Sequence, residues 1–271
     1  MGFSSDWLTL REPADRAARD TPLLQRALAL AGSDPVVMDL GCGTGSTVRT
    51  LAPALPPHTS WRLVDNDPEL LAQAAEAAGP HSSSHLVDID RLDQLPLEGV
   101  TLVTASALLD LVTEDWLVRF AAILTVPFYA ALSYNGQMHW SPADPRDEWI
   151  TEAFNRHQRI DKGLGPALGP TSVQRTIEVF EAAGFHVVHA ESPWRVGPDS
   201  EELQRAHVAG IAEAAAEAPA EAGAEAGAEG KAESARAWGE TRMAQARHTE
   251  SVTGHGDLLI IPPSATEPVV S

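Results

Sequence analysis

The feature that most constrains this chain is the stretch VVMDLGCGTGS at residues 36–46. An apolar run that ends in an aspartate predicts a buried strand, and the three closely spaced glycines after it predict a tight turn. Residues 46–55 then predict a helix. Glycine suits such a turn because it adopts backbone angles that a Cβ disfavours, and bare main chain lets a ligand reach the helix N-terminus. The stretch therefore predicts an α/β fold with a ligand beside its first strand.

The glycine spacing does not fit the dinucleotide-binding pattern G-x-G-x-x-G. Counted from Gly41, the third glycine position holds Ser46, and counted from Gly43 it holds Val48. An NAD(P)-dependent oxidoreductase is therefore not expected from this loop.

A second predicted strand, WRLVDND at residues 61–67, contains Asp65, which lies 20 residues after Gly45. Nucleotide-binding α/β folds place an acid at this distance, where its carboxylate accepts hydrogen bonds from the ribose hydroxyls. The pattern D-x-G-x-G-x-G at residues 39–45 resembles motif I of the class I S-adenosylmethionine (SAM) dependent methyltransferases. The resemblance implies SAM as cofactor, S-adenosylhomocysteine (SAH) as product, and cofactor-binding residues Asp39, Gly41, Gly43, Thr44, Gly45, Asp65, Asn66 and Ser106.

The resemblance covers residues 34–190 and 252–262. It implies a Rossmann-like, seven-stranded, mostly parallel sheet with helices on both faces. Residues 185–190 and 252–261 would form its antiparallel β6–β7 pair. We expect one methyltransferase domain over residues 1–271, with an N-terminal helical extension at 1–35 and an acceptor-binding insert at 135–170.

The family also implies two further cofactor contacts. An acid at the end of the third strand binds the adenine amino group there, and the third strand is predicted at residues 85–89. Asp90 is the expected residue, with Asp88 as the alternative. A basic residue of the N-terminal extension reaches the methionine carboxylate in many members, and we expect Arg19 in this role; surface solubility is the alternative. The extension carries three candidates: Arg11, Arg16 and Arg19.

Residues 106–110, SALLD, follow the predicted fourth strand, where methyltransferases of adenine N6 and of glutamine carry Asn/Asp-Pro-Pro-Tyr. Their absence argues against transfer to bases and amides. Asp110 either faces the acceptor or caps local structure, and the sequence leaves both open.

The acceptor pocket is predicted in the polar stretch that follows the fifth strand, itself expected at residues 127–134. The carboxyl ends of parallel strands bind substrate in open α/β sheets. The candidate general bases are Tyr134, His139 and His157, although His157 also fits a buried core histidine. The candidate substrate-binding residues are Asn135, Trp140, Asn155, Gln158, Asp161 and Lys162.

Two later segments carry local predictions. Thr171 and Gln174 have the spacing of a capping box that opens a helix over residues 171–183. Residues 213–233 reduce to alanine, glutamate and glycine, with a glutamate at every fourth position. Like charges at i, i+4 and interspersed glycines disfavour a helix, so we expect a flexible acidic insertion.

The net charge and the cysteine count limit the ligands and partners that we expect for this chain. The net charge of −19 disfavours binding to a phosphate backbone, and the single cysteine, Cys42, excludes internal disulfides and cysteine-based zinc sites. No metal site is predicted. The chain shows neither a leader nor a transmembrane run, so we expect a cytoplasmic protein without a membrane partner. We hypothesise a SAM-dependent methyltransferase of a small polar metabolite; the alternative is a non-catalytic SAM-binding protein or subunit. The oligomeric state is not predicted.

Overall fold

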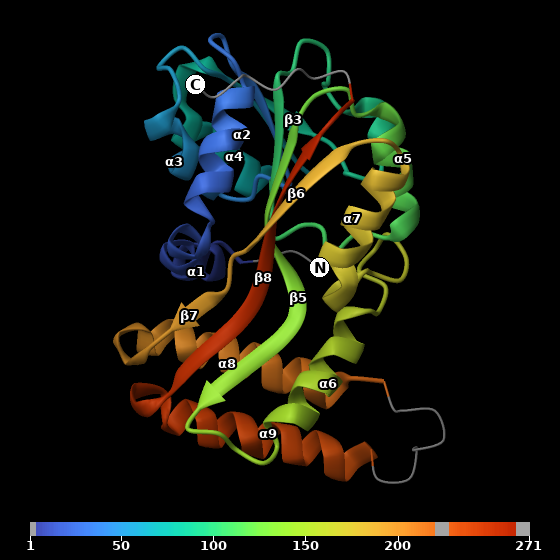
Figure 1. The fold of residues 1–271 in the computed structure, drawn as a ribbon. Coiled ribbons are helices and arrows are strands. Elements are labelled where there is room, and N and C mark those ends of the chain that lie inside the picture. The colour runs from blue at the N-terminus through green and yellow to red at the C-terminus, as the bar shows by residue number, and fades with distance from the viewer. Residues whose placement is uncertain (1–3, 220–227, 264–271) are drawn as a thin grey trace.

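A computed structural model describes residues 4–219 and 228–263 of the chain (Figure 1). Its strands are β1 (Val36–Leu40), β2 (Ser60–Asp65), β3 (Ser82–Leu86), β4 (Leu102–Ser106), β5 (Phe128–Ser141), β6 (His186–Glu191), β7 (Trp194–Val196) and β8 (Glu250–Ile261). Its helices are α1 (Ser5–Ala18), α2 (Thr21–Leu30), α3 (Ser46–Leu51), α4 (Pro68–Ala78), α5 (Glu114–Ile123), α6 (Asp147–Gln158), α7 (Ser172–Ala182), α8 (Glu201–Glu217) and α9 (Ala228–Ala244).

The strands form one sheet in the order β3-β2-β1-β4-β5-β8-β6. The first five are parallel, and β8 lies antiparallel between β5 and β6. This confirms the Rossmann-like fold and the antiparallel pair at the end of the sheet. The sheet has eight strands rather than seven, because the short strand β7 also pairs with β8.

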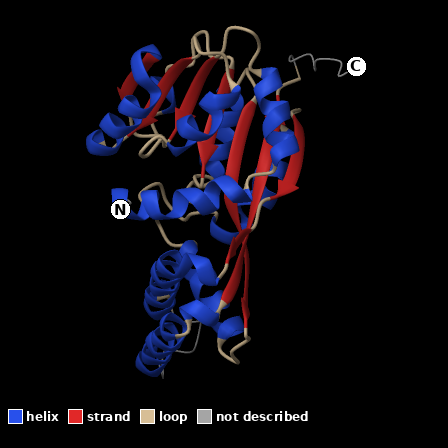
Figure 2. Cartoon of the chain, turned by 90° about the vertical axis from the view of Figure 1, so that its left-hand side faces the viewer, coloured by secondary structure: helices blue, strands red, loops and turns tan. Residues whose placement is uncertain are grey.

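Helices cover both faces of the sheet, as Figure 2 shows. Successive side chains of a strand point to opposite faces, so each strand contributes to two cores. Met38 of β1 packs in the core that holds α5 and α7, whereas its neighbour Val37 packs in the core that holds α2, α3 and α4.

The fifth strand is much longer than predicted, and with β8 it builds a lower lobe (Figure 1). β5 and β8 stay paired from Phe128 and Ile260 to Ser141 and Glu250, with two register shifts on the way. Helices α6, α8 and α9 pack against this two-stranded extension around a third core that includes Trp140. The first residues of the proposed insert at 135–170 therefore belong to β5, which was expected to end at residue 134.

The third strand lies earlier than predicted. Residues 82–86 pair in register with β2, and the predicted range of 85–89 overlaps them only at its start. Gly79, with φ +72°, ends α4, and the chain then enters the sheet almost at once. Asp88 and Asp90 consequently follow the strand by two and four residues instead of ending it.

One local prediction is wrong, and another falls partly outside the described residues. The capping box does not form, because Thr171 donates its hydroxyl backward to the Leu168 carbonyl (2.8 Å) and Gln174 donates to Glu178 (2.7 Å). The acidic segment is helical at residues 213–217 and 228–233, residues 218–219 are not helical, and 220–227 lie outside the described residues. Tertiary packing overrides the weak local propensity at residues 213–217, since Ala215 is buried in the lower core.

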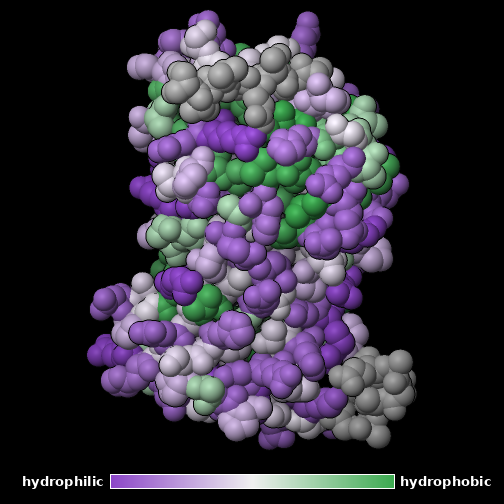
Figure 3. All heavy atoms as spheres, viewed as in Figure 1, coloured by the Kyte–Doolittle hydropathy of each residue, from purple (hydrophilic) through white to green (hydrophobic). Residues whose placement is uncertain are grey.

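Hydrophilic residues cover most of the lower lobe in the view of Figure 3, and apolar residues gather on the upper lobe where Figure 1 draws the edge strand β6. None of the helices in the described part of the chain is both long and apolar enough to cross a membrane.

Candidate functional site

The glycine loop joins β1 to α3 in left-handed backbone conformations. Gly41, Gly43 and Gly45 have φ values of +61°, +52° and +84°. A Cβ on Gly45 would also lie 3.0 Å from the Cα of Ala74, closer than a real Cβ tolerates without movement of its neighbour. The loop is therefore bare main chain at the carboxyl end of β1, where open α/β sheets bind nucleotides.

Asp65 ends β2 and faces this loop. Its carboxylate accepts hydrogen bonds from the backbone N–H groups of Gly43 (2.8 Å) and Asp67 (3.0 Å). The glycine loop is thus fixed to the second strand, and the acid lies at the position predicted for a ribose contact.

Asp39 is a buried acid beneath the loop. One oxygen accepts a hydrogen bond from the Thr104 hydroxyl (2.7 Å), and Oδ2 has no hydrogen-bond partner among the described residues. Burial raises the pKa of Asp39 to about 7, although the Thr104 hydrogen bond and the Arg19 charge oppose this shift. A buried acid with an unused oxygen is a site where a ligand donor would be stabilising.

Arg19, just after α1, is a buried cation with spare donors. Its Nη2 donates to the Ser106 hydroxyl at the end of β4 (3.0 Å), and its guanidinium lies 5.9 Å from the Tyr129 ring centre. Nε and Nη1 have no hydrogen-bond partner in the described part of the chain. A buried guanidinium with free nitrogens suits a ligand carboxylate, because a carboxylate accepts two of its hydrogen bonds.

Helix α1 closes over the glycine loop. Glu12 pairs with Arg49 of α3 (2.5 Å), and Arg49 also donates to the Thr44 carbonyl. On the same helix, Leu8 lies against Gly43. The N-terminal extension is therefore part of the site's architecture.

The other predicted cofactor residues differ in exposure and in their partners. Thr44 is buried and Asn66 is exposed. The Asp90 carboxylate forms an ion pair with Arg119 of α5, and the Asp90 N–H donates to Asp88 (3.0 Å). Asp90 thus already has a strong partner on the helical face.

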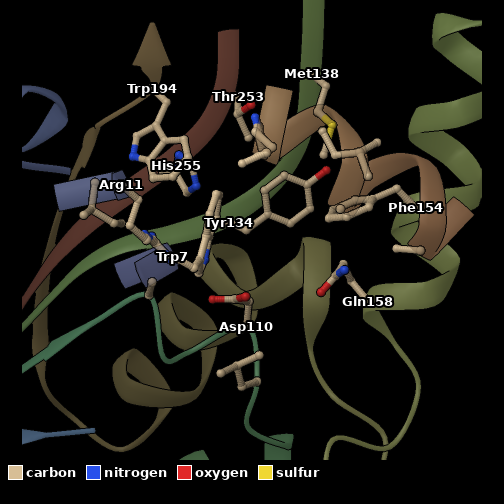
Figure 4. Close-up of a pocket in the computed structure, with 18 residues that line it drawn as sticks. Trp7, Arg11, Asp110, Tyr134, Met138, Phe154, Gln158, Trp194, Thr253 and His255 are labelled. Atoms are coloured by element: carbon tan, nitrogen blue, oxygen red, sulfur yellow. The ribbon is translucent and has the colours of Figure 1, made fainter. Parts of the chain in front are cut away.

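A cavity of about 310 Å³ lies where the upper sheet meets the lower lobe (Figure 4). Its walls come from α1, the turn after β4, β5, α6, β7, α8 and β8. The residues that line it are Trp7, Arg11, Ala107, Asp110, Leu111, Leu132, Tyr134, Met138, Phe154, Gln158, Trp194, Ala206, His207, Gly210, Ile211, Ala214, Thr253 and His255.

Of the nine residues predicted for catalysis and acceptor binding, Tyr134 and Gln158 line this cavity. The seven that do not are Asn135, His139, Trp140, Asn155, His157, Asp161 and Lys162. The physical reason is that residues 134–141 form a strand, so Tyr134 and Met138 reach the cavity while His139 is exposed to solvent.

Each of several remaining candidates has a partner elsewhere. Asn155 accepts a hydrogen bond from the Tyr134 hydroxyl (2.8 Å), so it positions a cavity residue from behind. Trp140 packs on Trp238, and His157 lies 3.6 Å from Glu217.

Asp161 accepts from the N–H groups of Gly163 and Gly165 and so shapes its own loop. Lys162 is half-buried and interacts electrostatically with Asp110, and burial lowers the pKa of its ammonium.

The wall of the cavity opposite Tyr134 and Gln158 was not predicted from the sequence. Trp7 and Arg11 come from α1, His207 from α8 and His255 from β8. The only available signal was the basic character of the N-terminal extension, because residues from both ends of the chain meet here. Asp110, whose role the sequence left open, lines the cavity and is partly buried, and its buried Oδ1 has no hydrogen-bond partner among the described residues.

The charges around the cavity are few. Arg11 forms a two-pronged ion pair with Asp15, at 2.9 and 3.1 Å. Burial, reinforced by the Arg11 charge, lowers the pKa of His207 to about 4 and of His255 to about 3. Both imidazoles are therefore neutral at pH 7. Burial also raises the pKa of Asp110.

Comparisons with known proteins agree with this architecture. Residues 37–126 match the model of a family described as "Methyltransferase domain". Trans-aconitate 2-methyltransferase of Klebsiella pneumoniae is 27% identical over 226 residues, which are 77% of this chain and 83% of that protein. The enzyme of the same name from Streptomyces coelicolor is 34% identical over 141 residues, 48% of this chain and 46% of that protein.

Among solved structures, the cyclopropane synthase MmaA2 from Mycobacterium tuberculosis has the same fold, with a TM-score of 0.50 and 14% identity over 96% of this chain and 94% of that one. The fold, the matched methyltransferase domain and these relatives together support a class I SAM-dependent methyltransferase. It is an enzyme whose cofactor is SAM and whose product includes SAH.

Proposed function

We propose that this chain transfers the methyl group of SAM to a small organic molecule held in the cavity between the two lobes. The observation that carries the proposal is the turn after β4. Ser106 receives the Arg19 hydrogen bond on the cofactor side, and the next residues, Ala107 and Asp110, line the cavity. A molecule in the cavity is therefore next to one bound by the glycine loop and Arg19.

We assign the cofactor contacts as follows. The backbone of the loop from Gly41 to Gly45 cradles the cofactor, Asp65 accepts from the ribose hydroxyls, and Arg19 binds the methionine carboxylate with its free nitrogens. The supporting residues are Asp39, Thr44, Asn66 and Ser106. Asp90 is a weaker candidate for adenine than its sequence position implied, because Arg119 competes for its carboxylate.

When bound, SAM supplies a methyl group on a positively charged sulfur. The protein's own part is to orient the acceptor oxygen, nitrogen or carbon in line with that methyl group and to exclude water. Tyr134 and Gln158 act as orienting groups, and Asn155 holds the Tyr134 hydroxyl. His139 has no part in this proposal, because it is exposed to solvent outside the cavity.

Three observations favour a small-molecule acceptor. The cavity is lined by residues of both lobes, the curated relatives are named for a small acid, and the net charge of −19 would repel nucleic acid. A cavity of this kind also argues against the alternative of a non-catalytic SAM-binding subunit. We further propose that both lobes act as one domain, because β5 and β8 run through both.

Arg19→Gln tests the cofactor assignment. Removing a buried charge-assisted contact to a carboxylate costs about 1.5–3 kcal/mol, so we expect the dissociation constant of SAM to rise by roughly 10- to 100-fold in calorimetry. Arg16→Gln is the matched control, since Arg16 lies on α1 with a side chain that is 55% exposed. Unchanged affinity of Arg19→Gln would remove the carboxylate assignment. A second assay distinguishes an enzyme from a binding subunit. The protein is incubated with SAM and cell extract, and we expect SAH to form. We expect no SAH when the protein is heat-treated or when the extract is left out.

A further inference from the structure

The walls of the cavity are mainly aromatic and aliphatic. Trp7 and Trp194 stand at one side with ring centres 6.3 Å apart, and Tyr134 meets Phe154 edge to face at 5.6 Å on the other (Figure 4). The aliphatic side chains that complete the lining are Leu111, Leu132, Met138 and Ile211. Such walls favour a flat or otherwise apolar ligand body, because burial of its surface and ring contacts are both stabilising.

Arg11 offers the cavity one cationic contact. Asp15 binds its Nε and Nη2, which leaves Nη1 outside that ion pair. The guanidinium lies 4.9 Å from the ring centre of Trp194, and the Trp194 N–H donates to Asp15 (2.9 Å). The guanidinium is thus held between the Asp15 carboxylate and the Trp194 ring, and its Nη1 edge is left for a ligand.

Among the described residues, Lys162 is a further cation near the cavity: it does not line it, but it interacts electrostatically with the lining residue Asp110. Among the described residues that line the cavity, Arg11 is the only one that is positively charged at pH 7, since His207 and His255 are neutral there. Asp15 already offsets the Arg11 charge, and Asp110 adds a further acid to the wall.

From these walls and charges we propose that the acceptor carries a single carboxylate on an aromatic or similarly apolar body, and that di- and tricarboxylates are excluded. One carboxylate can approach the free edge of Arg11 while the body fills the space between the tryptophans and Phe154. A second or third carboxylate would be buried without a counter-charge and near Asp110, which is strongly unfavourable. The proposal rests on the proposed function, because it takes this cavity as the acceptor site.

This substrate class differs from the one for which the curated relatives are named. Trans-aconitate carries three carboxyl groups, and the 27% identity of the Klebsiella enzyme leaves room for a different cavity. Trans-aconitate is therefore the natural competitor in a test.

The experiment measures binding to the SAH-loaded full chain by calorimetry, with three probes: cinnamate, the uncharged cinnamyl alcohol and trans-aconitate. We expect cinnamate to bind at least tenfold more tightly than either of the other two. Tighter binding of trans-aconitate, or no binding of cinnamate, would overturn the proposal. SAH affinity is measured in the same samples: if SAH fails to bind, the proposed function fails, whereas SAH binding with a preference for trans-aconitate overturns only the substrate class.

Variants locate the carboxylate contact. Arg11→Gln combined with Asp15→Asn removes the ion pair without leaving a buried charge, and we expect it to lose the tenfold preference for cinnamate over cinnamyl alcohol. Arg11→Lys keeps the charge and is expected to retain part of the preference. Arg16→Gln on the exposed side of α1 is the control and is expected to keep it in full. A double variant that still prefers cinnamate tenfold would show that Arg11 does not bind the carboxylate.

Discussion

Asp257 of β8 is a buried carboxylate whose removal we expect to damage both lobes at once. It accepts three hydrogen bonds, from the Tyr129 hydroxyl (2.7 Å), the Leu132 N–H (2.9 Å) and the Asp20 N–H (3.1 Å). Leu132 has a φ of +58°, an unfavourable value for a branched side chain, and it lies where the β5–β8 register shifts. The carboxylate therefore stabilises the irregular point at which β5 leaves the upper sheet and enters the cavity wall.

The expected size of the effect follows from these contacts. Asp257→Ala leaves three buried donors without an acceptor, and each such donor costs about 1–3 kcal/mol. Partial relaxation and entry of water reduce the sum, so we expect a loss of about 3–6 kcal/mol. At about 2 °C per kcal/mol for a chain of this size, the melting temperature falls by roughly 6–12 °C. Asp257→Asn keeps one acceptor oxygen, and its loss is expected to be about half as large.

Differential scanning calorimetry with SAH titration separates the two consequences. Because Leu132 lines the cavity, we expect Asp257→Asn to weaken acceptor binding more than SAH binding. Asp34→Ala, which changes an 89% exposed side chain, is the control and is expected to melt within about 1 °C of the parent. An Asp257→Ala protein that also melts within about 2 °C of the parent would refute the assignment of three stabilising hydrogen bonds.

Two further predictions concern the glycine loop. In urea unfolding, Gly45→Ala is expected to lose about 1–3 kcal/mol more stability than Gly32→Ala. Both glycines have a positive φ, but only Gly45 has a close neighbour, Ala74. Equal losses would mean that backbone strain alone determines the effect. Asp39 titrates near pH 3.8 when unfolded and near 7 when folded, so its contribution to stability falls as pH rises through that window. The stability of Asp39→Asn relative to the parent is therefore expected to increase between about pH 4 and 7, by roughly 4 kcal/mol at most. If the free energies of unfolding of the two ligand-free proteins change with pH in parallel, the raised pKa is contradicted.

The sequence alone determined the parts of this protein that depend on neighbouring residues. The strand-to-glycine-loop transition at residues 36–46 appears as predicted, and Asp65 ends the second strand beside this loop, while its ribose contact stays a prediction. Helix α4 spans Pro68–Ala78 as expected, because a proline at its start and a glycine at its end are local signals. The roles given to Arg19 and Asp90 stay predictions, although the structure provides Arg19 with free donors and Asp90 with a competing partner.

Tertiary structure alone decided the cavity that we propose as the acceptor site. The length of β5 depends on β8, which follows more than a hundred residues later, so no periodicity within residues 128–141 could predict it. The cavity wall combines Trp7 and Arg11 from the first helix with His255 from the last strand. The helices at the two ends of the acidic segment also depend on tertiary packing. Ala215 of α8 and Ala235 of α9 are buried in the same core, where the two helices pack together. Local propensity depends on the interactions of a residue with its neighbours in sequence. The length of β5, the cavity and the helices of the acidic segment depend instead on burial between elements that are distant along the chain.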